Sequence, residues 1–475
     1  MKQGFRRAGL AAMLIASLAA GCAGGSGGGG ATAGIDRGGI YAVGPITGFG
    51  SIIVNGVEYA TSGASVSVDG QPGTESDLRV GQIVQVVGTL DGSGTKGTAT
   101  RITYDDQLEG PVQSIDLAAS RMVVLGQTVQ VGADTSFDDR IVPRGLDGLL
   151  VGDRVEVSGN VASNGVVNAT RIERKSAAAS VEVKGTVASL DTNAKRYLLG
   201  TLQVDYSAAQ LSGFASGQPA SGDVVESVGT LNGDGVLVAS RVEKESGGVP
   251  GTSDDKADFE GLVTRFASAT DFDVAGQRVT TTASTAYDGG TSANLALDVR
   301  VEVEGGFDTS GRIVATKVAF RRESNVEFNA RVDSVNVAGN SLVVLGVTVR
   351  TNSLTRFEDQ SSAQVQRFSL ANLSVGDFVE VRAYDDGSGL LATLLEREDS
   401  QDRIELQGPA AGLVQPNFTV AGIAVTTDAS TEFRDKSGVT ITADAFFAAA
   451  SGQAVQVRGT LVGNTVLAER AELED

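Results

Sequence analysis

A short motif, Gly-Asp-x-Val-Glu-Val-x-Gly, recurs along the chain at nearly constant spacing. Its clearest copies span Gly152 to Gly159 and Gly376 to Val381, and looser copies span Gly81 to Gly88, Gly222 to Gly229, Arg300 to Gly305 and Gly452 to Gly459. The closing residues are Gly88, Gly159, Gly229, Gly305, Ala383 and Gly459, so the steps are 70 to 78 residues. Internal repetition of this kind is the signature of an array of small modules.

A second pattern keeps the same phase: an apolar run, a Gly and another apolar run, as in Met122 to Val131. The counterparts of Gly126 are Gly56, Gly200, Gly276, Gly346 and Gly422. A Gly-x pair between two β-branched runs predicts a two-residue type II′ hairpin, because Gly supplies the positive φ at the first central position. A last strand in each unit carries Ala with a basic residue two positions later: Ala99/Arg101, Ala169/Arg171, Ala239/Arg241, Ala315/Lys317 and Ala468/Arg470, with Ala392/Leu394 in the fifth unit.

Each unit opens with a short strand near a small residue, at Gly44, Gly110, Gly185, Gly261, Ala330 and Gly408. Between the third and fourth strands lies a longer stretch, which often begins Thr-x-aromatic: Thr135/Phe137, Thr285/Tyr287, Thr355/Phe357 and Thr431/Phe433. This stretch has room for one or two helical turns. The segment from Thr442 to Ala450 predicts a capped helix, because Thr is a good N-cap before an Ala-rich run.

Each unit therefore follows the order β-β-β-(short α)-β-β in about 65 residues, which is the element order of an OB-fold, a small five-stranded barrel. An immunoglobulin-like sandwich is the alternative, but it needs about seven strands and about 100 residues. We predict an all-β chain with short helices, a tandem array of six OB-like barrels. Their expected ranges are 38–106, 107–176, 177–249, 250–322, 323–400 and 401–475, called repeats 1 to 6 below.

The first residues predict an export signal. Lys2, Arg6 and Arg7 are basic, and the apolar run from Ala8 to Ala20 is too short to span a bilayer. The run ends at Gly21-Cys22 and resembles a bacterial lipobox, which implies cleavage between these residues and lipidation of Cys22. Ala19 departs from the Leu usual at that position, and a plain secretory signal is the alternative. We expect a signal peptide over 1–21, then the lipidated Cys22 and a Gly-rich tether over 22–37.

Several residue types are scarce, and this restricts the chemistry. The 475 residues include no His, no Trp and one Cys, with 58 acidic and 38 basic side chains and a formal net charge of −20. The absence of His removes the commonest general base and metal ligand. One Cys excludes an intramolecular disulfide and a Cys-based zinc site. The acidic balance disfavours nucleic acid as a partner.

The strongest copies of the pattern lie in the second and fifth units. They contain Val124-Leu125-Gly126, Thr135-x-Phe137 and Val151 to Val157, and Val344-Leu345-Gly346, Thr355-x-Phe357 and Val375-Gly376-Asp377. These residues resemble a bacterial family known as domain of unknown function 5666, which occurs in tandem in predicted envelope proteins. The resemblance covers nearly all of residues 38 to 475. It implies an envelope location but transfers no site residue, since the family has no known activity.

Four patterns were considered as sites. Gly92 to Gly97 matches the dinucleotide fingerprint Gly-x-Gly-x-x-Gly, but we expect a hairpin turn there rather than the strand-to-helix turn that the fingerprint needs. The acidic clusters Asp138-Asp139, Glu358-Asp359 and Asp385-Asp386 offer oxygen ligands for calcium, with solvated loops as the alternative. Glu156/Arg171, Glu226/Arg241 and Glu302/Lys317 predict exposed cross-strand pairs or side chains that simply face water. Sugar binding on an OB face is disfavoured by the low aromatic content, 5%.

We therefore expect a non-enzymatic envelope lipoprotein that acts as a structural or protein-interaction array. We assign it no catalytic, cofactor-binding or metal-binding residues, and Cys22 is the one functional residue that we predict. The expected partners are the membrane, through the lipid, and envelope proteins or glycans, without nucleic acid. The expected location is the outer membrane, facing the periplasm or the surface. A carbohydrate- or small-ligand-binding role is the alternative, and a periplasmic enzyme is a more remote one.

Overall fold

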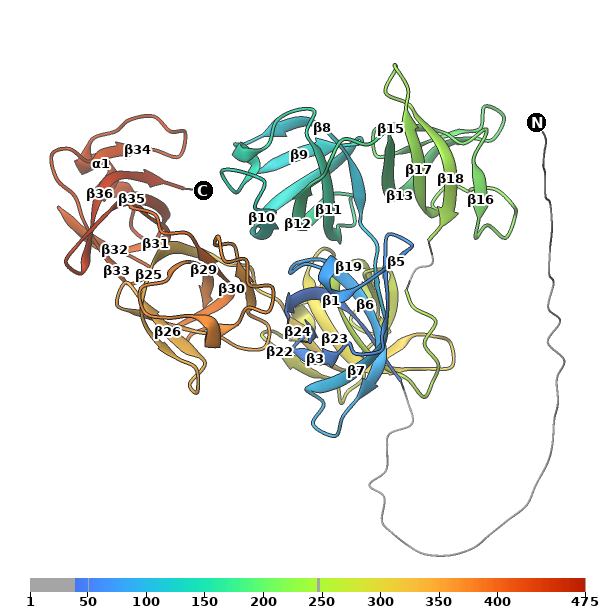
Figure 1. The fold of residues 1–475 in the computed structure, drawn as a ribbon, viewed down its shortest axis with the longest axis horizontal. Helices are drawn as coiled ribbons and strands as arrows, with labels where there is room; N and C mark the ends of the chain where they lie inside the picture. The colour runs from blue at the N-terminus through green and yellow to red at the C-terminus, as the bar shows by residue number, and fades with distance from the viewer. Residues whose placement is uncertain (1–38, 50, 246–247, 475) are drawn as a thin grey trace, which may run out of the picture. The chain divides into compact units, whose positions relative to one another are not determined.

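The computed structural model describes residues 39–49, 51–245 and 248–474, and almost all of its regular structure is β (Figure 1). Repeat 1 contains β1 Ile40–Gly48, β2 Ile52–Val54, β3 Val57–Ala60, β4 Ser65–Val68, β5 Gln71–Gly73, the 3-10 turn Glu75–Asp77, β6 Ile83–Leu90 and β7 Lys96–Tyr104. Repeat 2 contains β8 Leu108–Asp116, β9 Arg121–Val124, β10 Gln127–Phe137, the 3-10 turn Leu146–Gly148, β11 Arg154–Val161 and β12 Val167–Arg174. Repeat 3 contains β13 Ser180–Asp191, β14 Arg196–Leu199, β15 Leu202–Asp205, β16 Gln210–Ser212, β17 Val224–Leu231 and β18 Leu237–Lys244.

The second half of the chain repeats this order. Repeat 4 contains β19 Lys256–Ser268, β20 Asp271–Val274, β21 Gln277–Thr280, β22 Ala286–Asp288, the 3-10 turn Ser292–Asn294, β23 Arg300–Phe307 and β24 Ile313–Phe320. Repeat 5 contains β25 Val326–Asn336, β26 Ser341–Val344, β27 Val347–Arg350, β28 Arg356–Asp359, the 3-10 turn Leu370–Asn372, β29 Phe378–Asp385 and β30 Leu390–Glu398. Repeat 6 contains β31 Ile404–Val414, β32 Asn417–Val420, β33 Ile423–Thr426, β34 Glu432–Arg434, α1 Ala443–Ala449, β35 Ala454–Val462 and β36 Thr465–Leu473. No helix in these described ranges is long and apolar enough to cross a membrane.

Every repeat closes into a five-stranded barrel, which confirms the predicted fold. In repeat 2, β8 pairs with β9, β9 with β10, β10 with β12 in parallel, β12 with β11, and β11 with β8 again. The order 1-2-3-5-4-1 is therefore OB-like, and the other five repeats pair their strands in the same order. Closure satisfies the backbone groups that an open edge would expose.

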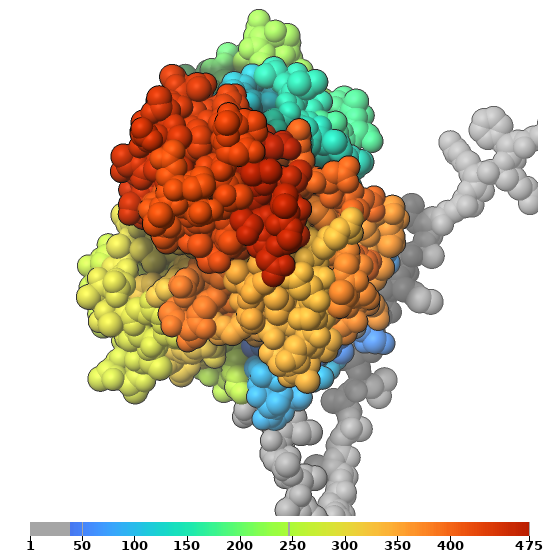
Figure 2. Space-filling view, turned by 90° about the vertical axis from the view of Figure 1, so that its left-hand side faces the viewer, coloured from blue at the N-terminus to red at the C-terminus, as the bar shows by residue number. Residues whose placement is uncertain are grey.

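The first strands of the barrels also pair between repeats, which was not predicted. Repeats 2 and 3 join through antiparallel β8 and β13, and repeats 5 and 6 through antiparallel β25 and β31. Repeats 1 and 4 are not consecutive, yet β1 and β19 pair in parallel from Ile40↔Lys256 to Val43↔Phe259. Repeats 5 and 6 share one hydrophobic cluster, and in Figure 2 repeat 6 (red) lies directly against repeat 5 (orange).

The hairpins between strands two and three correct the predicted turn type in five repeats. Leu125 and Gly126 have φ values of 48° and 70°, and the central residues of the other four hairpins likewise both have positive φ. Positive φ at both central residues is the type I′ pattern, with Gly second rather than first. Only the repeat 3 hairpin has Gly first, at Gly200 with φ 55°, as the prediction required. The right-handed twist of the strands favours both primed turns, and the prediction was wrong only in placing the Gly first instead of second in the turn.

The closing Gly of the recurrent motif faces a β-bulge. The register between strands four and five shifts beside this position in all six repeats. A Cβ added at Gly159 would lie 2.5 Å from the carbonyl oxygen of Asn168, so a larger residue requires strand five to move. Ala383 occupies the same position in repeat 5 and is fully buried, so that module accommodates one methyl group.

The Thr-x-aromatic segments fold as short strands rather than helical turns. The Thr hydroxyl donates to the carbonyl of the strand-five Ala, from Thr135 to Ala169 (2.8 Å), Thr285 to Ala315 (2.7 Å), Thr355 to Ala392 (2.8 Å) and Thr431 to Ala468 (2.7 Å). This bond holds the segment parallel to strand five. Helical structure follows this segment as a 3-10 turn in repeats 2, 4 and 5 and as α1 in repeat 6, where the Thr442 hydroxyl accepts from the Ala445 amide as predicted.

Candidate interaction sites between the repeats

Cys22, the cleavage position Gly21, the signal peptide and the tether all lie outside the described residues. Gly92 to Gly97 lie within the described part, at the hairpin between β6 and β7. The segment is therefore a turn between strands, as predicted, and lacks the helix on which a dinucleotide phosphate would rest.

Of the three predicted pairs between a Glu and a basic residue, the structure contains one. Glu226 and Arg241 form an ion pair, which confirms the prediction for repeat 3. The prediction is wrong in repeats 2 and 4, where Glu156 contacts Lys175 at 2.5 Å and Glu302 contacts Arg321. The strand register is not the reason, because Arg171 lies opposite Ser158 just as Arg241 lies opposite Val228 in repeat 3. In repeat 2 the arginine instead forms ion pairs with Glu173 and Glu358.

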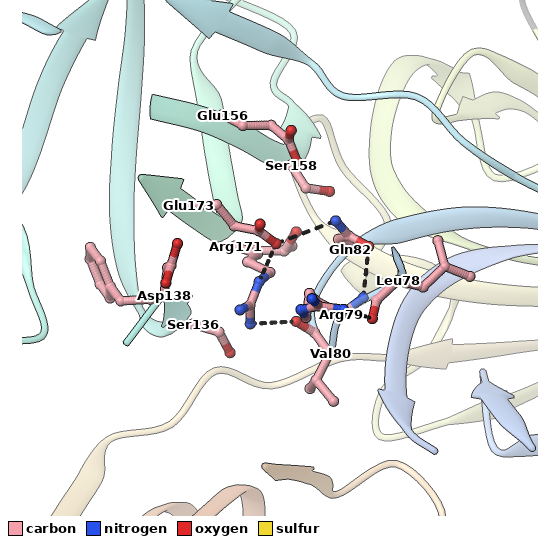
Figure 3. A network of polar contacts seen from close by, with 12 residues as sticks. Leu78, Arg79, Val80, Gln82, Ser136, Asp138, Glu156, Ser158, Arg171 and Glu173 are labelled. Atoms are coloured by element: carbon pink, nitrogen blue, oxygen red, sulfur yellow. Dashed lines mark hydrogen bonds and ion pairs between the residues drawn. The ribbon is translucent and has the colours of Figure 1, made fainter. Parts of the chain in front are cut away.

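The expectation that these groups face water is wrong for the glutamates of all three repeats, since Glu226 and Glu302 are 8% and 4% exposed, and in repeat 2 it is wrong for the arginine as well. Glu156 and Arg171 are 2% and 3% exposed. Arg171 lies between three repeats: its Nε donates to Glu173 at 2.7 Å, and its Nη1 donates to the Val80 carbonyl of repeat 1 and to Glu358 of repeat 5, both at 3.0 Å. Figure 3 shows the guanidinium between Glu173 and Val80. Burial disfavours the charge, but Glu358 and Glu173 outweigh it and raise the pKa of Arg171.

Repeats 1 and 2 are held together by further polar contacts around this position. The Ser158 hydroxyl accepts from the Ile83 amide at 2.9 Å, and the Tyr104 hydroxyl donates to Glu156 Oε1 at 2.8 Å. Burial raises the pKa of Glu156 to about 7, although Lys175 opposes the shift. Buried polar groups are stabilising only when they are paired, and this interface provides the partners.

Repeat 5 packs on repeat 2 through arginines. Arg382 is 9% exposed, and its Nη1 donates to the carbonyls of Ala133 and Thr135, both at 2.8 Å. Arg144 of repeat 2 contacts Glu396 and Glu398 at 3.0 and 3.1 Å. These contacts use the fork of guanidinium donors to bridge separate modules.

The acidic clusters considered for calcium are engaged by the protein itself. Asp138 contacts Arg140, Asp359 contacts Arg397 at 2.5 Å, and Asp386 contacts Arg350 at 2.5 Å. Two other carboxylate groups converge and were missed from sequence: Asp69 with Asp106 and Glu156, and Glu380 with Glu396 and Glu398. Cations of the protein already lie against both groups: Lys175 on Glu156, Arg382 on Glu380, and Arg144 on Glu396 and Glu398.

A cavity of about 530 Å³ opens on the outer face of repeat 2. Repeat 2 contributes the loop between its first two strands (118–120), strand β10, and the ends of β11 and β12 nearest their connecting loop. The loop between the first two strands and the face of the third strand are among the elements with which OB-folds bind oligosaccharides and oligonucleotides. Repeats 1, 4 and 5 supply the opposite wall, which includes Arg300, Arg322 and Arg356.

The sequence carried a signal for this cavity that we did not use. Gln130, Asn168 and Asn160 are the residues of repeat 2 that stand side by side on β10, β12 and β11. An alignment of the six units at these three positions would have shown an amide at each of them in repeat 2 alone. The arginines on the other wall could not be placed, because they come from repeats far away in the chain.

The comparison with known families agrees with the pattern of repeats. A family model described as a domain of unknown function (DUF5666) matches residues 38–103, 109–173, 177–243, 260–319, 330–396 and 408–472. No curated protein matches the chain.

Proposed function

The chain belongs to the DUF5666 family, and on this premise we propose that it is a membrane-anchored envelope lipoprotein whose OB-like modules form a non-enzymatic structural and interaction array. The observation that carries the proposal is the use of charged residues between modules. Arg171 connects repeats 1, 2 and 5, and Arg382 and Arg144 connect repeats 2 and 5. Such contacts favour a body of fixed modules over independent barrels on a string.

The composition supports a role that does not involve catalysis. The chain contains no His, and its single Cys stands in the lipobox-like segment, where lipidation would consume the thiol. The usual nucleophile and base pairs are therefore not available. Six diverged copies of one module suit repeated contacts better than one active site, because linked weak sites gain avidity.

The location follows from Cys22. Acyl chains on this residue would fix one end of the chain in the membrane, and the Gly-rich segment 24–30 would give the array reach. Ala23 follows the Cys, where an Asp would favour retention in the inner membrane, so we place the protein at the outer membrane. Envelope proteins or glycans are the proposed partners.

The anchor is tested by Cys22→Ser in the full-length chain. We expect the wild type in the membrane fraction and the variant in the soluble periplasmic fraction. Ser26→Ala in the tether is the matched control and should leave the wild-type distribution unchanged. A soluble wild-type protein would contradict the anchor.

The contact role is tested with purified full-length protein and envelope extracts. We expect retention of specific envelope proteins or glycans and no chemical change in them. Turnover of an envelope component by the purified chain would overturn the non-enzymatic proposal, whatever the outcome of the anchor test.

A further inference from the structure

The outer face of repeat 2 presents three carboxamides in one row. Gln130 lies directly opposite Asn168, and Asn168 lies directly opposite Asn160, so the row crosses β10, β12 and β11. All three are partly exposed and line the cavity. Gln130 donates to the carbonyls of the 118–120 loop, at 3.1 Å to Ala119 and 2.9 Å to Ser120. The amides of Asn160 and Asn168 have no side-chain hydrogen bond to another residue of the described ranges and remain available to a ligand.

The row is particular to repeat 2. The positions that align with Gln130, Asn168 and Asn160 through the same strand pairings carry other residues in every other repeat: Ala60, Thr98 and Thr89; Asp205, Val238 and Thr230; Thr280, Val314 and Gly306; Arg350, Leu391 and Tyr384; Thr426, Leu467 and Thr460. The barrel therefore does not need amides here. Neighbouring amides that each donate and accept are suited to the paired hydroxyls of a sugar.

The opposite wall is basic, in a chain that is acidic overall. The cavity lining contains four arginines and three carboxylates, Asp134, Glu260 and Glu323, whereas the whole chain has 38 basic and 58 acidic residues. Arg300 and Arg321 share Glu260, at 3.0 and 3.1 Å from their Nε atoms. The other two arginines of the lining, Arg322 and Arg356, contact no carboxylate within the described residues.

Arg356 is 6% exposed, and its guanidinium donates to neutral oxygens, including the Ser136 hydroxyl at 3.3 Å. Burial lowers its pKa, and Arg300 and Arg382 add to this shift against the opposing charge of Asp134. Arg322 lies over the ring of Tyr384, 5.9 Å from its centroid, and both line the cavity. An anionic group placed here would relieve the concentration of positive charge.

We propose that this cavity binds a short acidic saccharide, with the amides of Asn160 and Asn168 on its hydroxyls and Arg322 and Arg356 on its carboxylate. The volume of about 530 Å³ suits a small ligand of one or two sugar rings. The net charge of −20 disfavours long polyanions, so the ligand is a short segment or a chain end. This binding activity goes beyond the structural role and does not depend on the lipid anchor.

The experiment is calorimetric titration of the full chain with digalacturonate, and with an uncharged disaccharide, maltose, as the comparison. We expect binding of digalacturonate that weakens with salt, and affinity for maltose at least about tenfold lower. Asn168→Leu should lower the affinity for digalacturonate by about tenfold or more, because it removes a pair of hydrogen bonds. Leu occupies this position in repeats 5 and 6, so the variant should fold.

Two further variants keep the test decisive. Asn160→Thr installs the residue found in repeats 1, 3 and 6, and Arg322→Gln removes the exposed cation. Both should weaken digalacturonate binding, and Gln203→Leu on the exposed face of β15 should leave it unchanged. Equal affinity for the two disaccharides, no binding to the wild type, or binding that survives all three substitutions would overturn the proposal.

Discussion

Repeats 2 and 3 share one sheet and one strand order, yet they treat the same charged motif in opposite ways. Glu156 and Arg171 of repeat 2 correspond to Glu226 and Arg241 of repeat 3 in both sequence and strand register. The Arg171 side chain is 4% exposed, and that of Arg241 is 41% exposed. Among the described residues, the Arg241 side chain forms ion pairs with Glu226 and Glu243 of its own module, whereas Arg171 bridges to two other repeats.

The difference shows that the environment of a module, rather than its own sequence motif, decides what the motif does. One nearby residue reflects that environment. The Ser158 hydroxyl accepts a hydrogen bond from repeat 1, and its counterpart in repeat 3 is Val228, whose side chain has no acceptor. A buried charge is tolerated only with partners, and repeats 1 and 5 provide them for repeat 2.

The largest expected effect is the loss of folding stability on removal of Arg171, compared with removal of its counterpart Arg241. Arg171→Ala leaves Glu173, Glu358 and the Val80 carbonyl without their buried partner, so we expect a loss of about 3–5 kcal/mol in the free energy of unfolding. Arg241→Ala is the matched control and should cost less, about 1–2 kcal/mol, because the Arg241 side chain is 41% exposed, although its partner Glu226 is only 10% exposed. Urea unfolding of both variants measures the difference, and equal costs would mean that the contacts between repeats 1, 2 and 5 add nothing.

The second effect is a dependence on pH to which Glu156 of repeat 2 contributes, together with Glu182 and Glu327, whose pKa values burial also raises to about 7. The pKa of Glu156 is raised to about 7 by burial, so the folded state holds a proton that the unfolded state releases near pH 4.5. The stabilisation from this group is fully present below about pH 4.5 and is lost as the pH rises through 7. We expect at most about 3 kcal/mol from this group between pH 4.5 and 8.

Glu156→Gln should reduce this pH dependence by the contribution of one carboxyl, because Gln mimics the protonated acid while Glu182 and Glu327 still titrate. Glu243→Gln, at an exposed carboxylate of repeat 3, should leave the slope unchanged. Thermal unfolding of the wild type and both variants from pH 5 to pH 8 gives the three slopes. A wild type that becomes more stable as the pH rises over this range would refute the assignment to Glu156.

A third comparison uses the two buried tyrosines. Tyr104 donates to Glu156 at 2.8 Å, and Tyr197 lies 2.8 Å from the Ser227 hydroxyl of repeat 3. At pH 8, where Glu156 is ionised, Tyr104→Phe should cost about 1.5–3 kcal/mol because its bond has a charged acceptor. Tyr197→Phe breaks a neutral pair and should cost about 0.5–1.5 kcal/mol. The reverse order in urea unfolding would show that the Tyr104 contact is the weaker one.

The barrel could be predicted from the sequence because its signals are local. The closing Gly and the Ala-x-Arg pattern keep a constant spacing because they face each other across the same bulge, as Gly159 pairs with Ala169 in repeat 2. Which repeats join could not be predicted, since this depends on surfaces that meet only after folding. The sequence of repeat 1 contains one indication of its contact with repeat 4: Tyr41 and Val43 occupy positions that carry the polar residues Gln107 and Glu109 in repeat 2. In the structure, Tyr41 packs edge-on against Phe307 of repeat 4.

The smallest expected effect is a gain in the free energy of unfolding, from adding to repeat 3 a hydrogen bond that it lacks. Thr135 of repeat 2 donates to the Ala169 carbonyl at 2.8 Å, and the strand pairing places Ala209 of repeat 3 at the same position, opposite the Ala239 region of β18. Ala209→Thr would supply the missing hydroxyl, and the Ala209 amide already donates to the Tyr206 carbonyl, as the amides of Thr285, Thr355 and Thr431 do to the residue three positions earlier.

We expect Ala209→Thr to raise the free energy of unfolding by about 1 kcal/mol, the usual net value of one intramolecular hydrogen bond. Ala209→Val adds the same bulk without the hydroxyl and is the matched control. If the gain comes from the bond, Val at this position should be neutral or destabilising in urea unfolding. An equal gain from Val would assign the effect to packing, and the bond from Thr135 would then be a consequence of the fold of repeat 2 rather than a support for it.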